Sequence, residues 1–334
     1  MLVGGFGTRL RPLTLHTPKQ MLPVVDRPMI EWVLAHLEEH GIDEAILSLG
    51  DRPDAFEDAY PDGRCGGISL RFAVDPEPLD TAGAIRYAAE TAGIAERVVV
   101  VNGDVLTDLD VSALVAFHER AGAEGTIALT KVDDPSQFGV VPTDPDGRVL
   151  AFVEKPPAGE APTDRINAGT YVLEPSVFER IPSGRRVSIE RETFPLMVED
   201  RTLFAMDDGG VYWLDGGTPE TYLAAQLDLA AGRRRERPRA VAVSACIEDG
   251  ATVDDAVVQR EANVRAGATV RGSALLPGCS VGKGAMVLDS IVGPGAVIGA
   301  GAVVGELSII GDGAVVPDGA VLTGARFPDT EVSS

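Results

Sequence analysis

A glycine-rich segment close to the start of the chain combines a backbone suited to phosphate with two cationic side chains. Three glycines within four residues free the backbone to adopt positive φ angles and to bring N–H groups up to phosphate oxygens. Arginine and lysine follow in the same segment and add positive charge. The segment therefore predicts a site for the phosphates of a nucleotide. Its residues are Gly4, Gly5, Gly7, Thr8, Arg9 and Lys19.

The spacing of this segment excludes two common phosphate loops. A Walker loop needs Gly-Lys-Ser/Thr, but the first lysine is Lys19, and a dinucleotide fingerprint needs a third glycine where Leu10 stands. Because the loop follows the apolar run 1–3, we expect it to leave the first strand of an open α/β sheet, where such sheets bind ligands. Three residues are fewer than the usual five or six of a strand. Either this strand is abbreviated or it starts upstream of Met1.

Two aspartates are candidate ligands for a divalent cation. Asp104 follows a run of four valines, and Asp215 precedes a pair of glycines. Carboxylate oxygens are the ligands that Mg²⁺ prefers. An aspartate at the end of a buried strand also suits the N-cap of a helix. From the residues alone, both interpretations of Asp104 stay open.

Composition limits the partners of this protein. The chain has 334 residues and a formal net charge of −22, which makes nucleic acid and anionic membranes improbable partners. A phosphorylated ligand must then be held by local cations. The three cysteines show no C-x-x-C spacing, which argues against a disulfide framework or a structural zinc site. Without a signal peptide or a long apolar run, a cytoplasmic protein is expected.

The first two thirds of the chain follow an α/β pattern. Apolar spacing predicts a helix from 29 to 37 and buried strands at 45–49 and 97–101. More broken runs between 125 and 173 predict an added antiparallel lobe. An arginine-rich segment then interrupts the pattern. We therefore expect a catalytic domain over 1–231, a linker over 232–240, a repeat domain over 241–325 and a tail over 326–334.

The repeat domain carries an aliphatic residue every six positions. A glycine follows two places later, and the period runs back toward residue 247 with one slip in phase. This pattern predicts a left-handed β-helix of hexapeptide repeats in which each aliphatic residue is buried. Acyltransferases of this shape use a histidine base, but all four histidines lie at or before residue 118. We expect a role in regulation or in a homo-oligomer. The aliphatic positions include Ile291, Val297, Val303, Ile309, Val315 and Val321.

The segment from Gly4 to Lys19 resembles the signature of the sugar-1-phosphate nucleotidyltransferases, G-G-x-G-T-R-L-x-P-L-T-x-x-x-P-K. The likeness is closest to mannose-1-phosphate guanylyltransferase. It implies a Rossmann-like nucleotide-diphospho-sugar transferase domain that uses Mg²⁺ and acts on a nucleoside triphosphate and a sugar 1-phosphate. It also implies catalytic roles for Arg9 and Lys19. The same likeness makes Asp104 and Asp215 the metal ligands.

Further segments resemble motifs of this family in the family's order. Phe138-Gly139, the E-K-P motif and the N-x-G motif imply sugar-phosphate binding by Gly139, Glu154, Lys155, Asn167 and Gly169. The segment 79–84 resembles the L-G-T-A-G motif of guanylyltransferases, with an aspartate in place of its first glycine. This likeness implies nucleotide binding by Asp80, Thr81 and Gly83. Asp80 either accepts hydrogen bonds from guanine or occupies a solvated turn.

The resemblance thus favours transfer of a guanylyl group from GTP to mannose 1-phosphate. Two alternatives stay open: the same reaction with glucose 1-phosphate and dTTP or UTP, and a regulatory paralogue that binds an NDP-sugar without turnover. Such paralogues typically lose loop cations or a metal-binding aspartate. This chain keeps Arg9, Lys19, Asp104 and Asp215, which favours an enzyme.

Overall fold

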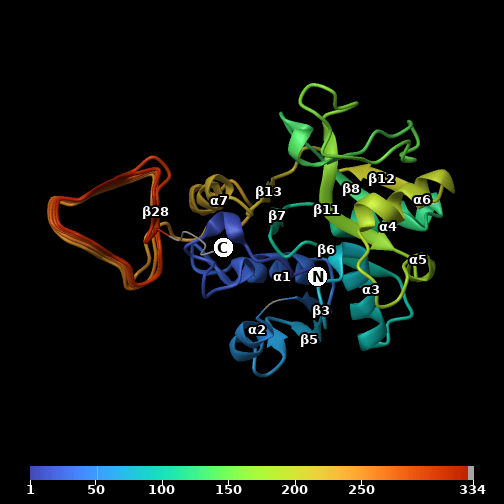
Figure 1. Ribbon diagram of the computed structural model, residues 1–334, viewed down its shortest axis with the longest axis horizontal. Coiled ribbons are helices and arrows are strands. Elements are labelled where there is room, and N and C mark those ends of the chain that lie inside the picture. Colours follow the sequence, from blue (N-terminus) through green and yellow to red (C-terminus); the bar gives the residue numbers. More distant parts are fainter. Residues whose placement is uncertain (51, 330–334) are drawn as a thin grey trace. The chain divides into compact units, whose positions relative to one another are not determined.

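The computed structural model describes residues 1–50 and 52–329, which form two compact units (Figure 1). The first unit comprises residues 1–5 and 33–213, and the second comprises 6–32 and the chain from 214 onward. These units are divided differently from the expected domains, since most of the glycine loop is grouped with the repeats. The expected boundaries stay a prediction, and residues 330–334 of the tail lie outside the described residues.

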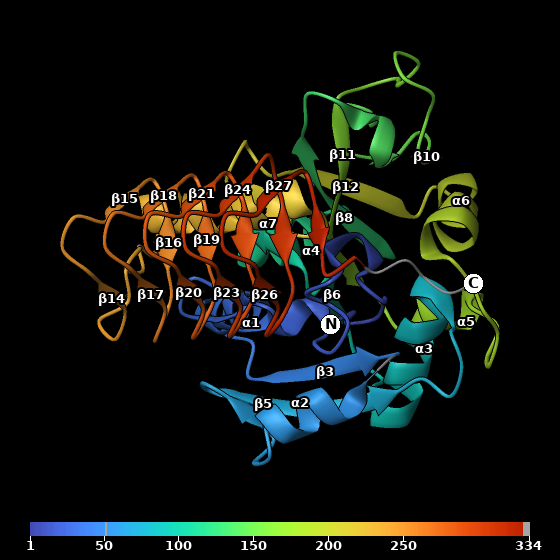
Figure 2. The same ribbon diagram turned by 60° about the vertical axis from the view of Figure 1, so that its left-hand side comes forward.

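The first unit is built on a mixed sheet whose two parts flank the amino-terminal residues. β3 (Glu44–Leu49) pairs in parallel with β5 (Ile68–Val74) (Figure 2). β6 (Val98–Val101) pairs antiparallel with β11 (Arg165–Leu173). Leu2 forms isolated parallel bridges to Ser48, in β3, and to Asn102, just beyond β6. The run 1–3 therefore lies between β3 and β6, at the centre of the sheet.

The antiparallel lobe expected between residues 125 and 173 is confirmed. β8 (Gly125–Lys131) and β9 (Gly139–Val140) both pair antiparallel with β11, and β10 (Val153–Glu154) pairs antiparallel with β9. β12 (Leu203–Asp207) adds a parallel strand beside β8. Fully buried side chains such as Ile127, Leu173 and Phe194 form the core beneath this lobe.

Helices and short elements complete the non-repeat part of the chain. The helix expected from 29 to 37 is confirmed as α1. None of the helices in the described part of the chain combines the length and apolar character needed to cross a membrane. The helices are α1 (Met29–Glu39), α2 (Pro53–Ala59), α3 (Asp80–Ala92), α4 (Val111–Ala121), α5 (Ser176–Arg180), α6 (Phe194–Glu199) and α7 (Pro219–Ala231), with 3-10 turns η1 (Thr8–Leu10), η2 (Lys19–Met21) and η3 (Pro135–Gln137) and a π-helix η4 (Ile189–Thr193). The short strands are β1 (Pro23–Val24), β2 (Arg27–Pro28), β4 (Arg64–Cys65), β7 (Val105–Thr107) and β13 (Trp213–Asp215).

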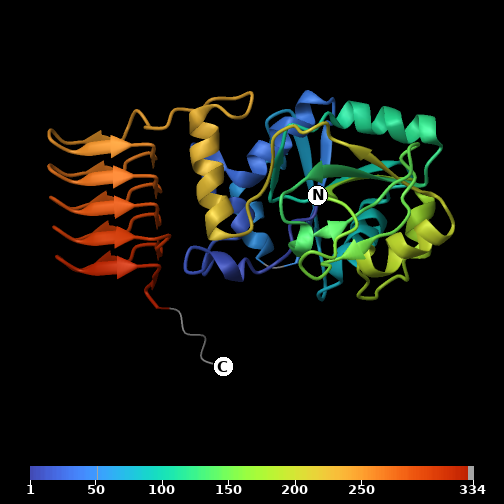
Figure 3. The same cartoon turned by 90° about the horizontal axis from the view of Figure 1, so that it is seen from above.

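The repeats form the expected β-helix. Within residues 241–329, three parallel five-stranded sheets enclose a triangular core (Figure 1), and the coils stack along one axis (Figure 3). The last strand lies inside the expected tail. The first sheet holds β14 (Cys246–Ile247), β17 (Asn263–Val264), β20 (Ser280–Val281), β23 (Val297–Ile298) and β26 (Val315–Val316). The second holds β15 (Thr252–Asp254), β18 (Thr269–Arg271), β21 (Met286–Leu288), β24 (Val303–Gly305) and β27 (Val321–Thr323), and the third holds β16 (Val257–Val258), β19 (Ala274–Leu275), β22 (Ile291–Val292), β25 (Ile309–Ile310) and β28 (Arg326–Phe327).

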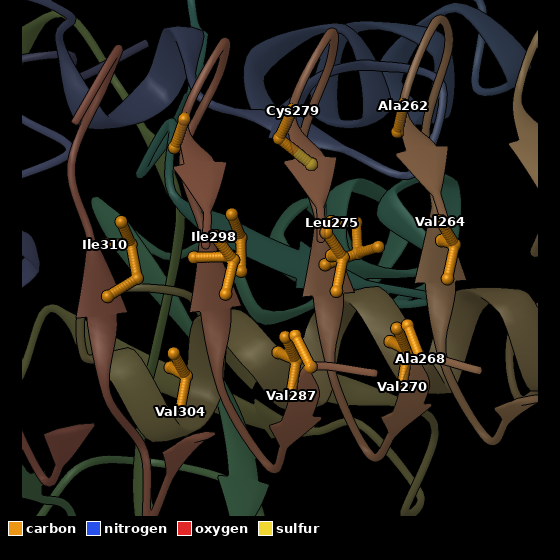
Figure 4. Packing of buried hydrophobic residues seen from close by; sticks show 14 of the residues in the cluster. Ala262, Val264, Ala268, Val270, Leu275, Cys279, Val287, Ile298, Val304 and Ile310 are labelled. Atoms are coloured by element: carbon orange, nitrogen blue, oxygen red, sulfur yellow. The ribbon is translucent and has the colours of Figure 1, made fainter. Parts of the chain in front are cut away.

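The expected burial of the six-residue series is wrong for several of its members. Val297, Val315 and Val321 are 40%, 64% and 68% exposed, and Val303 is half-buried. The side chains that fill the core belong to the following residues, such as Ile298 and Val304 (Figure 4). Two adjacent aliphatic residues share the same six-residue period, so the period alone does not tell which of them faces inward. Alternation along each strand turns one in and the other out.

The slip in phase has a regular structural cause. Cys246 pairs with Asn263, whereas Val297 pairs with Val315, so most coils hold 17 residues and one holds 18. The shorter coils lose a residue at the corner between the second and third sheets. A residue with positive φ stands at each short corner: Asp255, Gly272, Asp289 and Gly324. At the longer corner, Glu306 and Leu307 both have positive φ.

The third sheet of the β-helix is buried on its outer face as well. Val257, Ala274, Ile291 and Ile309 point away from the triangular core, yet each is 0% exposed. Within the second unit, α7 packs against β16 and β19. Ile291 and Ile309, in β22 and β25 of this sheet, are also fully buried and fulfil the expectation of burial that other members of the series do not.

Adjacent residues in one strand provide a test of this register. Replacing Ile298→Ala removes a fully buried side chain and should lower the free energy of unfolding by about 2–5 kcal/mol. Replacing Val297→Ala truncates the neighbouring side chain, which points outward, and should change the free energy of unfolding by less than about 1 kcal/mol. Urea unfolding of both variants measures the difference. Equal losses would contradict the inward assignment of Ile298.

Candidate functional site

The glycine loop of the second unit closes onto its own lysine. Gly7 has φ of +57°, and a Cβ at this position would lie 3.0 Å from Thr14 Cγ2 and 3.2 Å from Lys19 Cβ. The Thr14 hydroxyl donates to the Gly7 carbonyl at 2.8 Å. Leu10 and Leu13 are completely buried and anchor the loop. The spacing of Gly7, Thr14 and Lys19 thus reflects a close approach that only glycine permits.

Arg9 and Asp215 come together at a second glycine of the same unit. The Gly217 N–H donates to Asp215 Oδ1 at 2.9 Å. A Cβ at Gly217 would lie 2.8 Å from that oxygen and 2.9 Å from a guanidinium nitrogen of Arg9. The expected catalytic cation and one expected metal ligand therefore flank the same backbone position.

The remaining loop residues are exposed. Gly4 and Gly5 belong to the first unit, where they continue the run 1–3, and Gly5 has φ of +106°. Thr8 begins the 3-10 turn η1 in the second unit. Their N–H groups are suited to phosphate by position and backbone freedom, and phosphate binding by these residues stays a prediction.

Within the second unit, the last coils of the β-helix pack against the glycine loop. A Cβ at Gly311 would lie 3.0 Å from both Cβ and Cγ of Pro12, so a glycine is needed at this contact. At the next residue, Asp312, partial desolvation raises the pKa of the carboxyl to about 6, while the charge of His16 opposes the rise. The loop and the solenoid therefore share one packed contact within the second unit.

Side chains of helix α7 form hydrogen bonds to Pro23 and Val25, which follow the glycine loop. The Tyr222 hydroxyl and Gln226 Nε2 both donate to the Pro23 carbonyl, at 2.6 and 2.7 Å. Gln226 Oε1 accepts the Val25 N–H at 2.8 Å and Gln259 Nε2 of the β-helix at 3.1 Å. Both glutamines are buried. Their hydrogen bonds connect the β-helix to α7 and to the segment that follows the loop.

In the first unit, Asp104 stands beside the N-x-G motif. The Asn102 N–H donates to the Gly169 carbonyl at 2.9 Å. Gly169 has φ of +76°, and a Cβ there would lie 2.7 Å from Asn102 Nδ2. The half-buried Asp104 follows two residues later. The end of β6 and the N-x-G motif of β11 therefore meet, and metal binding by Asp104 stays a prediction.

Asn167 lies at an irregularity in β11. The pairing of β11 with β8 shifts between Asn167 and Tyr171. Inside this break, Asn167 Oδ1 accepts the Gly169 N–H at 2.9 Å, and Asn167 Nδ2 donates to the Tyr171 hydroxyl at 2.8 Å. Such bulges re-aim side chains next to binding sites.

Gly139 and Glu154 face each other across β9 and β10. They are direct partners in the ladder, and a Cβ at Gly139 would lie 2.6 Å from the Phe152 ring and 3.1 Å from Glu154 Oε2. Burial, and to a smaller extent the charge of Glu190, raise the pKa of the Glu154 carboxyl. Lys155 has φ of +50°, and its ammonium lies 3.9 Å from Glu154 Oε1.

Glu190 is a member of this cluster that the sequence did not single out. Thr81 Oγ1 and Ser188 Oγ both donate to Glu190 Oε2, each at 2.8 Å. Burial, Glu190 and Glu154 all act to raise the pKa of Tyr171. Glu190 lies in the π-helix η4, a form often found at functional sites. No spacing in the sequence marks this glutamate, because Thr81 is 109 residues away and meets it only in the folded chain.

The start of α3 is packed tightly against residues 185–187. A Cβ at Gly83 would lie 2.5 Å from the Arg185 carbonyl oxygen, so this glycine has a packing role. Asp80 has φ of +60°; its carboxylate accepts the Thr81 N–H at 2.9 Å and lies 3.5 Å from Arg186 Nε. Nucleotide binding by Asp80, Thr81 and Gly83 stays a prediction.

Each unit thus assembles part of the expected site. The second unit joins Arg9 to Asp215 and closes the loop on Lys19. The first unit gathers Asp104 and the N-x-G motif at one place, and Gly139, Glu154 and Thr81 around Glu190 and Tyr171. Asp104 and Asp215 fall in different units, so a metal site shared by them stays a prediction. Within 1–50 and 52–329, no three His, Cys, Asp or Glu side chains are grouped to hold a metal.

Comparison with known proteins assigns the family. The model of the nucleotidyl transferase family matches residues 1–232. The chain belongs to this family. A second model, the GMPPB C-terminal domain, matches residues 236–334. The family membership confirms the resemblance seen in the motifs.

Several relatives are similar to this chain over the greater part of its length. The mannose-1-phosphate guanylyltransferase of Mycobacterium tuberculosis is 43% identical over 236 residues, which cover 70% of this chain and 64% of the relative. The mannose-1-phosphate guanyltransferase of Candida albicans is 42% identical over 234 residues, covering 67% of this chain and 62% of the relative. The match thus spans less than two thirds of these relatives. The crystal structure of HddC from Yersinia pseudotuberculosis, 30% identical, superposes with a TM-score of 0.58 over 67% of this chain and 96% of that chain.

The carboxylate pair of the first unit gives a prediction. Replacing Glu190→Gln removes a like charge and should lower the pKa of Glu154, which should stay above its usual range because burial is the larger cause. NMR titration of the Glu154 side-chain carbonyl measures this. The exposed residue Glu179 offers a control, Glu179→Gln, that should leave the pKa unchanged. An unaltered Glu154 pKa in E190Q would show that the two carboxyls do not interact.

The contact between the glycine loop and the β-helix gives a further prediction. Replacing Gly311→Ala forces Pro12 to move and should speed amide hydrogen exchange at Leu13 and Leu15, whose N–H groups donate to carbonyls within the loop. Gly305→Ala, in the same β-helix, is the control for loop contact, because its φ is not positive and a Cβ there meets no atom closer than 3.9 Å. Equal exchange in both variants would show that the Gly311 contact does not hold the loop.

Proposed function

We propose that this chain transfers a nucleotidyl group from a nucleoside triphosphate to a sugar 1-phosphate and releases pyrophosphate. We propose GTP and mannose 1-phosphate as its substrates and Mg²⁺ as its cofactor. Membership of the nucleotidyl transferase family supports the reaction class. The printed names of the relatives support the choice of substrates.

The chemistry requires cations more than it requires a base. A phosphate oxygen of the sugar phosphate attacks the α-phosphorus, a new P–O bond forms, and the bond to pyrophosphate breaks. The attacking oxygen is already ionised, so no proton needs to be removed. Repulsion between two anions is the main obstacle, and positioned positive charge overcomes it.

The observation that carries this proposal is the meeting of Arg9 and Asp215 at Gly217. A guanidinium beside a carboxylate, next to a glycine-rich loop, suits a phosphate held together with a cation. Arg9 and Lys19 would neutralise the triphosphate. Asp104 and Asp215 are half-buried carboxylates, the hard oxygen donors that fit Mg²⁺. The ion, when bound, would neutralise phosphate charge.

The cluster around Glu154 would hold the sugar. Carboxyl and amide groups of Glu154, Glu190 and Asn167 offer hydrogen bonds to hydroxyls. A side chain at Gly139 would collide with the Phe152 ring and crowd Glu154, so glycine lets both side chains keep their positions. The exposed ammonium of Lys155 is available for the sugar phosphate. The start of α3, with Asp80 and Thr81, would bind the base.

Pyrophosphate release tests the proposal. The assay pairs GTP, ATP, dTTP or UTP with mannose 1-phosphate or glucose 1-phosphate, with and without a chelator. GTP with mannose 1-phosphate should be fastest, and the chelator should abolish release. Preference for dTTP or UTP with glucose 1-phosphate would overturn the substrates but keep the reaction. Binding of an NDP-sugar with no turnover for any pair would identify a regulatory protein instead.

A substitution at Lys19 tests whether this residue acts in catalysis or in stability. Replacing Lys19→Ala removes charge from the leaving pyrophosphate and should reduce kcat by about 10²-fold or more, because electrostatic stabilisation is the largest contribution in such sites. The melting temperature should change little. Lys283→Ala, at an exposed corner of the β-helix, is the matched control and should alter neither quantity. A large fall in melting temperature with intact turnover would make Lys19 a structural residue.

A further inference from the structure

The start of helix α3 carries an aspartate in a backbone conformation that favours glycine. Asp80 has φ of +60°, and it stands where the L-G-T-A-G motif has a glycine. Aspartate tolerates this left-handed region better than most residues, but the conformation still strains the backbone. Strained positions are held in place by their surroundings and are concentrated at functional sites. The Asp80 carboxylate is therefore a candidate for a function of its own.

Both carboxylate oxygens of Asp80 have partners within the first unit. Oδ1 accepts the Thr81 N–H at 2.9 Å, and Oδ2 lies 3.5 Å from Arg186 Nε. The ion pair makes Oδ2 less available as an acceptor for the N–H groups of a base. This arrangement disfavours direct recognition of guanine by Asp80. It favours Asp80 as the support of the Arg186 cation.

Backbone hydrogen bonds fix Arg186 beside this aspartate. The N–H of Val187 donates to the Leu79 carbonyl at 3.0 Å. The carbonyl of Val187 accepts the N–H groups of Ala82 and Gly83, at 2.9 and 3.2 Å. The residue that follows Arg186 is thus bound to the first turn of α3 at three points. The Arg186 side chain itself is 74% exposed.

The Arg186 guanidinium has N–H donors that can serve a ligand. An arginine side chain carries five such donors in a planar fork. Over residues 1–50 and 52–329, Asp80 is the one carboxylate within ion-pair distance of this guanidinium, and the contact is at Nε. The nitrogens Nη1 and Nη2 lie at the far end of the exposed side chain. They can donate in parallel to two acceptors of one ligand.

The start of α3 lies at the edge of the sheet where open α/β sheets bind ligands. β3 and β5 are parallel, and the Asp75 N–H donates to the Leu49 carbonyl where both strands end. Gly50 comes next, and a Cβ there would lie 3.9 Å from Gly4 Cα. The loop 75–79 leads from this point directly into α3. The first glycine of the expected phosphate site and the start of α3 therefore share the carboxyl edge of the sheet.

We propose that Arg186 determines the preference of this site for guanine and that Asp80 is its positioning residue. The Arg186 guanidinium donates to O6 and N7, the two acceptors that guanine presents side by side. Adenine has a donor amino group in place of O6, and the pyrimidines have no N7. The inference rests on the proposed function, because it concerns the base of the nucleotide that the site would take.

Binding of GTP analogues to the full chain tests the role of Arg186. 7-Deaza-GTP lacks N7, so its Kd should be at least about fivefold weaker than that of GTP, because the bidentate contact loses one hydrogen bond. Replacing Arg186→Ala should weaken GTP binding by about 5–100-fold and give GTP and 7-deaza-GTP the same Kd. ITP lacks the 2-amino group but keeps O6 and N7. Its Kd relative to GTP should be the same in both proteins, since arginine accepts no hydrogen bond. Calorimetry measures each Kd.

Two further variants separate the planar fork from the charge. Arg186→Lys keeps the charge but loses the fork, so it should also lose the discrimination against 7-deaza-GTP. Arg185→Ala removes the neighbouring exposed side chain and is the matched control, which should leave every ratio of Kd values unaltered.

Asp80→Asn tests the positioning role. Asparagine tolerates the left-handed backbone and keeps an acceptor for the Thr81 N–H, but it loses the charge beside Arg186. The variant should discriminate less against 7-deaza-GTP. Combined with R186A, it should add nothing to the loss of GTP affinity, because the two residues act as one unit. Additive losses would show that Asp80 acts independently of Arg186.

The outcomes distinguish this inference from the proposed reaction. Equal Kd values for GTP and 7-deaza-GTP in the unaltered chain would overturn the inference, as would discrimination that survives R186A or an ITP ratio that changes in it. Discrimination without pyrophosphate release would support the inference and refute the reaction. Release from GTP without discrimination would refute the inference alone. Failure of GTP to bind would refute both.

Discussion

Close approach of the chain to itself, at positions where no Cβ fits, is the constraint on which the second unit depends. Gly7 lies against Thr14 and Lys19, Gly217 lies between Asp215 and Arg9, and Gly311 lies under Pro12. Each contact brings a segment within about 3 Å of where a side chain would begin. The first contact packs the loop against Lys19, the second brings Arg9 close to Asp215, and the third packs the loop against the β-helix. In a chain of net charge −22, such local arrangement is the means by which an anionic ligand can be held.

The solenoid is therefore part of the loop's support and not only an appended module. Its third sheet is buried on both faces, because α7 packs on the outer side. The buried pair Gln226 and Gln259 satisfies the polar groups at this contact and connects it to Pro23 and Val25. Buried amides that pair in this way specify one arrangement, since any other leaves a polar atom without a partner. This explains why residues 6–32 form one compact unit with the repeats, across the boundary that the sequence suggests.

The sequence predicts most where chemistry requires a particular residue at a particular spacing. The motif from Gly4 to Lys19 and the hexapeptide period were sufficient for the family and for both architectures. The period did not reveal which of Val297 and Ile298 faces inward, because both repeat every six residues and only the strand's alternation separates them. Glu190 was missed for a related reason. Thr81 and Ser188 donate to Glu190 when α3 and the π-helix η4 have folded against each other. No spacing along the sequence encodes that contact.

Glu154 and Glu190 show how the folded chain gives two acidic side chains different surroundings. Burial and the neighbouring carboxylate both favour the protonated form of Glu154. The two hydroxyls of Thr81 and Ser188 donate to Glu190 Oε2 and satisfy it as an acceptor. The two acids therefore meet different surroundings. Burial moves the protonation of Glu154 to higher pH than that of an exposed glutamate, whereas Glu190 accepts two hydroxyl hydrogen bonds, and only the folded chain creates this difference.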